Sequence, residues 1–338
     1  MESHTIRELR HRFVEDTGLP IQVIQSPFFE SRIELFEKEF EAKTKYENYL
    51  GFVNEHYDGS AHKFLDDYFA IRSRIIDDRA NSVAFKAFNE DKAITSLFKE
   101  FKPIVGNVNL YTQEQVKDGS NCFLTFDMKK ANFQALRKIN PEIVLNAENY
   151  HDFIMKYVDE KWEWIADSKR TRQIIFGQLN PKRTMQVEKV FIGQLVDILS
   201  KYESITKHFT LFSMNSDELI YKLNAGEDFD AVISEVATEL CENAMNDKSL
   251  FERTGIRYRV EFFKLTCHTF KARNTDRQTH VYVKNFMLDD KREYKCADMK
   301  YFPQTYKLIN GLEVNDNDLV FFNDNMELAR FLYPLEKV

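Results

Sequence analysis

The chain has 338 residues, a length that suggests two domains or one domain with appendages. Hydrophobic residues make up 43% and charged residues 30%, so a sizeable core is expected in a water-soluble chain, and no apolar stretch reaches the roughly 18 residues that a membrane-spanning helix needs. The formal net charge of −7 argues against a broad basic surface for nonspecific binding of duplex nucleic acid.

Cysteine usage and the polar start of the chain indicate a reducing compartment. The cysteines are widely spaced, and they form no Cys-x-x-Cys pair of the kind that zinc sites use. The opening residues, MESHTI, are polar and do not resemble a secretory signal. We therefore expect buried free thiols in a cytoplasmic protein. The four cysteines are Cys122, Cys241, Cys267 and Cys296.

Helices are predicted for most of the first hundred residues. Segment 31–50 contains neither proline nor glycine and has helical composition, and 83–101 is expected to form one helix or two. Segment 64–76 carries an apolar stripe at helical spacing, which would lie on one face of a helix. The stripe consists of Phe64, Tyr68, Ile71 and Ile75.

The pattern changes after Pro103, where strands begin to alternate with helices. Up to residue 202 the predicted elements are strands at 104–111 and 123–127 and helices at 129–139, 150–157, 168–179 and 186–202. Beyond residue 223 they are a helix at 228–244, strands at 256–266 and 280–287, a turn at 315–318 and a short helix at 326–332.

Two strand ends in this region carry acids. Segment 208–223 consists of two apolar runs separated by Asn-Ser-Asp-Glu, a pattern that predicts a hairpin with Asp217 and Glu218 at its turn. Asp127 closes the strand 123–127 in the same way. Carboxylates on the ends of neighbouring strands are what a two-metal phosphoryl-transfer site requires.

The hairpin resembles the last catalytic motif of family A DNA polymerases, in which His-Asp-Glu separates two apolar strands. Here Ser216 stands in place of the histidine. The segment from Asp127 to Arg137 is similar to the first motif of that family and also to that of reverse transcriptases, in which an alanine follows the Asp by four residues, as Ala131 does. The resemblance places Asn132 and Phe133 near the sugar of the incoming nucleotide.

The basic helix between these motifs resembles the fingers helix of the same family. That helix carries a cation and, one turn later, an aromatic residue followed by glycine, and Arg172, Phe176 and Gly177 match this spacing. The resemblance implies that Arg172 and Lys169 hold the triphosphate and that Phe176 stacks on the incoming base. The neighbouring cations, Lys182 and Arg183, are expected to contact the nucleic acid.

The resemblance implies an α+β fold with a polymerase-like palm, in which helices accompany an antiparallel sheet, and a small fingers region. It divides the chain into a helical, thumb-like region (1–102), a palm and fingers core (103–270) and a C-terminal α+β extension (271–338). It also implies nucleotide addition to a nucleic-acid 3′ end, from nucleoside triphosphates, with two Mg²⁺ or Mn²⁺ ions. The metal ligands and catalytic residues would be Asp127, Asp217 and Glu218.

Other interpretations remain open at this stage. Asn-Ser-Asp-Glu is also a good turn sequence, Asp127 is also a suitable helix cap, and Phe176 is also a suitable core residue. Reverse-direction tRNA-end polymerases share the Ser-Asp-Glu motif, but they have Gly and Arg where Met128 and Lys129 follow the first acid here. A third alternative is an inactive palm that binds nucleic acid or a protein. Arg257 and Arg259 would touch phosphates or, in the favoured interpretation, pair with nearby acids.

Overall fold

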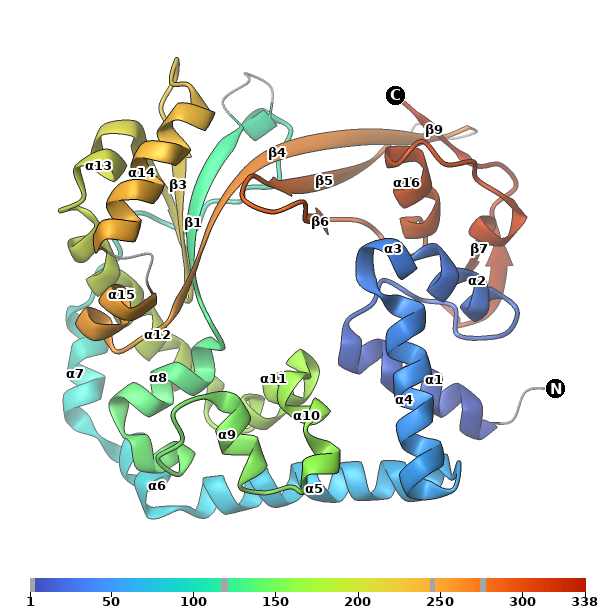
Figure 1. The fold of residues 1–338 in the computed structure, drawn as a ribbon, viewed down its shortest axis with the longest axis horizontal. Coiled ribbons are helices and arrows are strands. Elements are labelled where there is room, and N and C mark those ends of the chain that lie inside the picture. Colours follow the sequence, from blue (N-terminus) through green and yellow to red (C-terminus); the bar gives the residue numbers. More distant parts are fainter. Residues whose placement is uncertain (1–3, 117–120, 244–246, 274–277) are drawn as a thin grey trace.

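The computed structural model describes residues 4–116, 121–243, 247–273 and 278–338. It has the expected α+β class, with helices arranged around an antiparallel sheet (Figure 1). In these ranges, no helix combines the length and the apolar character needed to cross a membrane. In Figure 1 the long helix α5 runs along one edge of the molecule, with α1 and α4 at one of its ends and α6 and α7 at the other.

Seven helices make up the N-terminal region, and local capping explains where they break. The predicted helix 31–50 is divided because Glu41 adopts a left-handed conformation (φ 54°), while the side chain of Glu37 accepts hydrogen bonds from the backbone of Lys43 (2.7 Å) and Thr44 (3.1 Å). Segment 83–101 forms two helices, separated by Asp91. The helices are α1 (His4–Thr17), α2 (Phe28–Leu35), α3 (Glu37–Phe40), α4 (Ala42–Tyr57), α5 (Ala61–Asn81), α6 (Val83–Glu90) and α7 (Lys92–Glu100).

The main sheet confirms the hairpin and both acid-bearing strands. Its strands are β1 (Cys122–Met128), β2 (Phe209–Met214), β3 (Glu218–Leu223), β4 (Tyr258–Ala272), β5 (Gln278–Phe286) and β6 (Arg292–Lys295), in the order β2-β3-β1-β4-β5-β6, and β9 (Leu335–Lys337) also pairs with β4. The first four strands and the helices between them form a β-α-β-β-α-β arrangement. β4 continues past residue 270, and β5 pairs along it.

Helices between the strands cover one face of the sheet. Leu124 and Phe126 of β1 point into the main core, whereas Phe123 belongs to a smaller cluster on the opposite face with Phe263 and Tyr282. The covering elements are α8 (Ala131–Ile139), α12 (Pro181–Leu199), α13 (Glu203–His208), α14 (Phe229–Asn243) and α15 (Asp247–Thr254). In contrast, α9 (Tyr150–Met155), α10 (Trp164–Asp167) and α11 (Lys169–Gly177) lie beside α5 (Figure 1), and short 3-10 turns occur at Pro141–Val144 and Glu160–Trp162.

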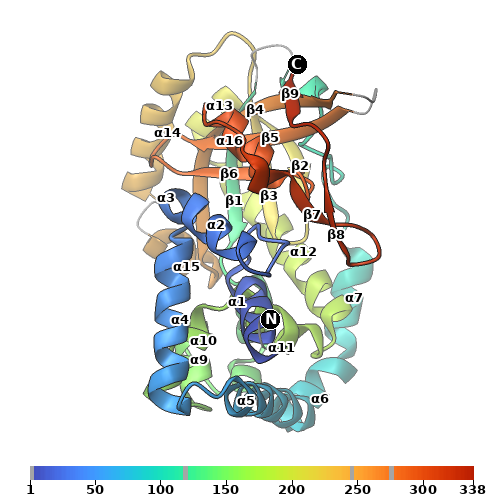
Figure 2. The same cartoon turned by 90° about the vertical axis from the view of Figure 1, so that its right-hand side faces the viewer.

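The C-terminal segments return to the N-terminal helices, as Figure 2 shows. Arg32 of α2 and Asp318 form a buried ion pair (3.0 Å), and Phe36 packs on Phe302 with ring centroids 5.5 Å apart. The contacts therefore join the two ends of the chain in one packed region. The elements involved are α16 (Phe302–Ile309), a 3-10 turn (Asp316–Leu319), β7 (Val320–Phe322) and β8 (Leu328–Arg330).

Three sequence predictions differ from the structure. Segment 104–111 forms no regular strand, because it meets the edge strand β2 mainly through the Ser213 side chain, which accepts a hydrogen bond from the Val108 amide (2.9 Å). The predicted helix at 326–332 is the strand β8, which pairs with β7. Of the thiols expected to be buried, Cys122 is buried but Cys296 is exposed, and the side chain of Cys241 lies outside the described residues.

Candidate active site

Strand register brings the three predicted acids together. Asp127 at the end of β1 lies directly opposite Glu218 at the start of β3, and the Met128 amide donates a hydrogen bond to the Asp217 carbonyl (2.8 Å). The turn before β3 is closed by the Asn215 amide, which donates to the Glu218 carbonyl (2.9 Å). The acids therefore occupy adjoining ends of two paired strands, as the sequence predicts.

The three carboxylates influence one another electrostatically. Burial raises the pKa of Asp127, the nearby Arg259 guanidinium opposes this, and the charge of Asp217 raises the pKa further. Burial also raises the pKa of Glu218, which Lys284 lowers and both aspartates raise. Neighbouring like charges on half-buried groups are typical of sites that hold a cation or a proton.

Cations on the next strands partly neutralise this acidic cluster. Arg259 of β4 contacts Asp127 (3.4 Å) and Glu261 (3.2 Å), so the predicted pairing of this arginine with nearby acids is confirmed. Lys284 of β5 lies 3.9 Å from Glu218 and 4.5 Å from the centre of the Phe263 ring. Its ammonium is buried, which lowers its pKa. These groups lie on the sheet face that carries Asp127.

A fourth acid near the site, Glu188, was not singled out from the sequence. Its side chain projects from α12 and is 3% exposed, and the Asn132 amide donates a hydrogen bond to it (2.9 Å). Burial and the charge of Asp217 raise its pKa to about 8. The sequence does indicate that Glu188 is buried, because it precedes Ile192 and Leu195 by four and seven residues and therefore lies on the buried stripe of its helix.

Two cations of α11, Lys169 and Arg172, lie near Asp127. Lys169 is exposed and lowers the pKa of Asp127. Arg172 is half-buried, and its guanidinium lies 5.7 Å from the centre of the Tyr150 ring. Burial lowers the pKa of Arg172, while Tyr150 and Asp127 raise it. The helix thus directs positive charge toward the acidic strand ends.

The aromatic residues expected beside a nucleotide lie in the core instead. Phe133 and Phe176 are 1% and 2% exposed, and they pack with Tyr150 and Phe153 in one aromatic cluster. Helix amphipathicity explains this position, because Phe176 follows Arg172 by one turn but belongs to the apolar stripe with Ile175. In this structure neither ring is open to a base.

The remaining predicted cations have different environments. Arg183 joins α12 to α6 and α7, donating to the carbonyls of Phe88 (2.9 Å) and Asp91 (2.6 Å) and to the Thr95 hydroxyl (3.0 Å). These bonds give it a structural role. Lys182 is exposed at the start of the same helix, where it is accessible to a partner.

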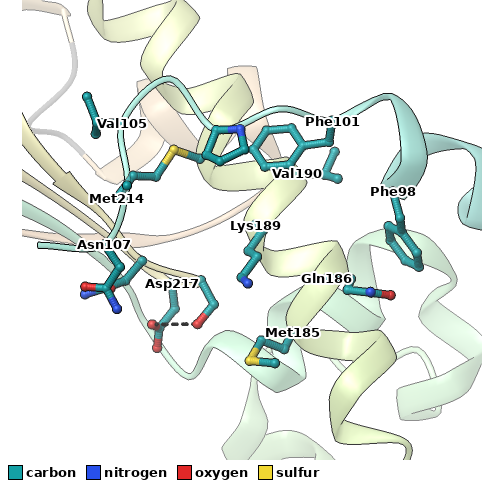
Figure 3. A pocket seen from close by; sticks show the side chains of 14 residues that line it. Phe98, Phe101, Val105, Asn107, Met185, Gln186, Lys189, Val190, Met214 and Asp217 are labelled. Atoms are coloured by element: carbon teal, nitrogen blue, oxygen red, sulfur yellow. Dashed lines mark hydrogen bonds between the residues drawn. The ribbon is translucent and has the colours of Figure 1, made fainter.

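A pocket of about 520 Å³ opens beside Asp217 (Figure 3). Figure 3 shows Lys189 extending from α12 into the space between that helix and Asp217, whose carboxylate accepts a hydrogen bond from the Ser216 hydroxyl (3.4 Å). Phe101 forms an apolar wall and lies against Gly193 of α12. The pocket therefore combines an acid, a cation and apolar surface, and its size suits a small organic ligand.

The acidic cluster has the donor chemistry for Mg²⁺ or Mn²⁺. Asp127, Asp217 and Glu218 offer the carboxylate oxygens that these ions prefer. In the part of the chain that the structure describes, no three His, Cys, Asp or Glu side chains converge into a ready metal-binding group. One oxygen of the Asp127 carboxylate contacts Arg259 (3.4 Å), so a metal ion would share this acid with the guanidinium.

Comparison with known proteins adds no assignment to this site. No protein-family model matches the sequence, and the search of curated proteins gives no match. The polymerase resemblance therefore depends on the motifs and their geometry.

Proposed function

We propose that the protein is a metal-dependent nucleotidyltransferase that adds nucleotides to the 3′ end of a nucleic acid. The observation that carries this proposal is the strand register, which sets Asp127 opposite Glu218 and beside Asp217. Acids on adjacent strand ends, facing a helix with two cations, form the charge pattern that phosphoryl transfer uses. Catalysis of this reaction depends on positioning and charge neutralisation and requires little covalent chemistry.

Each group has a distinct part in this proposal. Asp127 and Asp217, with help from Glu218, would hold two Mg²⁺ or Mn²⁺ ions, which supply charge neutralisation at the attacking hydroxyl and the triphosphate. Arg172 and Lys169 of α11 would bind phosphate oxygens, because a guanidinium can contact two of them at once. Nucleoside triphosphates and a nucleic-acid primer, with or without a template, are the proposed substrates.

Primer extension tests the proposal directly. Purified protein would be incubated with labelled DNA and RNA primers, with and without templates, with each nucleotide set and Mg²⁺ or Mn²⁺. Extension by the wild type that is lost in Asp217→Asn and kept in Asp324→Asn, a matched change at an exposed position, would support the assignment. Absence of extension in every lane would refute the catalytic proposal.

A binding module without catalysis is the second candidate, and one observation favours it. Arg259 already pairs with Asp127 (3.4 Å), so part of the negative charge that a metal ion would use is neutralised by the protein itself. A module of this kind would use Lys182 and the cations of α11 to bind nucleic acid. It would bind labelled single strands equally well in wild-type and Asp217→Asn forms, without extending them.

A further inference from the structure

The pocket beside Asp217 has the size and the mixed lining of a small-molecule site. Its volume of about 520 Å³ lies within the roughly 300–1,000 Å³ typical of such sites. The end of α7, the segment 103–107, one face of α12 and the turn between β2 and β3 line it. Helix α7 carries none of the polymerase-like motifs, so the ligand is inferred from the side chains themselves.

Aromatic rings at the end of α7 form an apolar wall that other parts of the fold hold in place. Phe101 lies against Gly193 of α12, where a Cβ atom would come within 2.3 Å of the ring. Arg183, which does not line the pocket, lies 5.4 Å from the centre of the Phe98 ring. Both rings are half-buried, so each has surface that a ligand can reach. A flat ring would pack well on such a wall.

Polar side chains without partners occupy the other parts of the pocket. Lys189, Gln186 and Asn107 are exposed and Asn215 is half-buried, so all four are accessible to a ligand. Within the described part of the chain, these four side chains make no hydrogen bond or ion pair. Figure 3 shows Phe101 and Met214 on one side of the pocket and Asn107, Lys189 and Asp217 on the other.

These groups together fit a nucleotide. A carboxamide both donates and accepts hydrogen bonds, as the edges of nucleobases do, and an ammonium group binds phosphate. Among the described residues that line the pocket, Lys189 is the sole cation. One cation suits a single phosphate-bearing unit, whereas a longer strand needs a row of cations along its backbone.

The cations that would hold a triphosphate lie on the other side of the acidic cluster. Lys169 and Arg172 of α11 act on the pKa of Asp127, and neither lines the pocket. The pocket instead opens beside Asp217. Two substrates of a nucleotidyl transfer could therefore approach the acids from different sides, with the incoming triphosphate near Asp127 and the acceptor near Asp217.

We propose that this pocket holds the nucleotide that accepts the new unit, and that a free nucleotide fills it, so that synthesis can begin without a primer. This inference rests on the proposed nucleotidyltransferase function. The base would lie against Phe98 and Phe101, the 5′-phosphate near Lys189 and the 3′-hydroxyl near Asp217. The hydroxyl oxygen would form a bond to the α-phosphorus of the incoming triphosphate, the bond from that phosphorus to pyrophosphate would break, and the hydroxyl proton would pass to solvent.

Calorimetric titration of nucleoside 5′-monophosphates in EDTA tests the site without metal ions. We expect saturable binding of the monophosphates and weaker binding of nucleosides or inorganic phosphate, because the pocket offers groups for both the base and the phosphate. No binding of any monophosphate at millimolar concentration would overturn the proposal.

Two variants with matched controls locate the binding. Lys189→Ala should weaken it about tenfold, the effect of one hydrogen bond to a charged group, whereas Lys201→Ala, at an exposed position two residues beyond the same helix, should not. Met185→Trp, at a 41% exposed position that lines the pocket, should fill it and abolish binding, whereas Met326→Trp, at a 72% exposed position outside it, should not. Circular dichroism confirms that each variant is folded. Binding that Lys189→Ala and Met185→Trp leave unchanged would overturn the proposal.

Dinucleotide synthesis tests the role of the bound nucleotide. A labelled nucleoside 5′-monophosphate would be incubated with a nucleoside triphosphate and Mn²⁺ but no primer, and products would be identified by mass spectrometry. The monophosphate has no pyrophosphate to release, so it can serve only as the acceptor. We expect a dinucleotide with a single 5′-phosphate, and Lys189→Ala should raise the KM for the monophosphate about tenfold while leaving the KM for the triphosphate nearly unchanged.

The outcomes separate this inference from the proposed function. Primer extension without dinucleotide formation would overturn the inference and leave the nucleotidyltransferase proposal standing. Monophosphate binding with neither primer extension nor dinucleotide formation would refute catalysis and the acceptor role together, and the pocket would remain a nucleotide-binding site.

Discussion

Replacing Glu188 by glutamine should make the protein more stable at neutral pH and change how its stability depends on pH. The carboxyl is 3% exposed, and its pKa is raised from an ordinary value of 4.5 to about 8, first by burial and then by the charge of Asp217. The folded state therefore binds this proton more tightly than the unfolded state does. Stability contributed by the neutral carboxyl is present at acidic pH and is lost as pH rises from 4.5 toward 8.

The size of the effect follows from these two pKa values. Linkage predicts that Glu188 lowers the free energy of unfolding by about 2–3 kcal/mol between pH 5 and pH 7. Glutamine does not titrate, and its side-chain oxygen can still accept the hydrogen bond from Asn132. The stability of Glu188→Gln relative to the wild type should therefore rise by about this amount over the same interval.

Urea unfolding of both proteins, followed by circular dichroism in EDTA at several pH values, measures this difference. A matched change, Glu313→Gln at an exposed site, should show no such trend. In an Asp217→Asn background the pH dependence should shrink, because that charge contributes to the raised pKa. A stability difference between Glu188→Gln and the wild type that stays constant from pH 5 to pH 7 would refute the reasoning.

Three further substitutions, one of them with a matched control, test the packing around the site and between the N- and C-terminal segments. Gly193→Ala would place a Cβ 2.3 Å from the Phe101 ring, so overpacking should cost about 1–3 kcal/mol in thermal or urea unfolding. Asp318→Asn leaves a buried guanidinium without its ion-pair partner and should lower the free energy of unfolding by about 3–5 kcal/mol. Arg183→Ala removes three hydrogen bonds and should cost about 2–4 kcal/mol, whereas Lys182→Ala should stay within about 0.5 kcal/mol. Equal losses in these last two variants would contradict the structural role of the arginine.

Local patterns predicted the elements that place the acids. The alternation around Asp127 and the polar interruption at Asp217 and Glu218 each define a strand end within a few residues, and these signals need no knowledge of distant partners. The pairing of Arg259 with acids was also predictable, because it shares a strand face with Glu261. The closeness of Asp127 to Asp217 and Glu218 follows from these strand ends if the two strands are neighbours in the sheet.

Other features depend on distant contacts that a local pattern does not contain. Phe176 has the spacing of a stacking residue, but the same spacing suits a core position, and contacts with Tyr150 and Phe153 decide between them. Segment 326–332 has helical composition, yet pairing with β7 makes it a strand. Glu188 lies on the apolar stripe of its helix, but an acid on a helix is usually exposed, and only the tertiary structure shows that it lies close to Asp217.

The ion pair between Arg32 and Asp318 has a consequence for synthesis of the protein on the ribosome. The two residues are 286 positions apart, so at 5–20 residues per second the arginine emerges roughly 15–60 s before its partner. During that interval its guanidinium has no buried carboxylate to meet, and Phe36 lacks the ring of Phe302. We expect the surface around Arg32 and Phe36 to stay uncovered until residues 302–318 have been synthesised, leaving apolar surface for chaperones to cover.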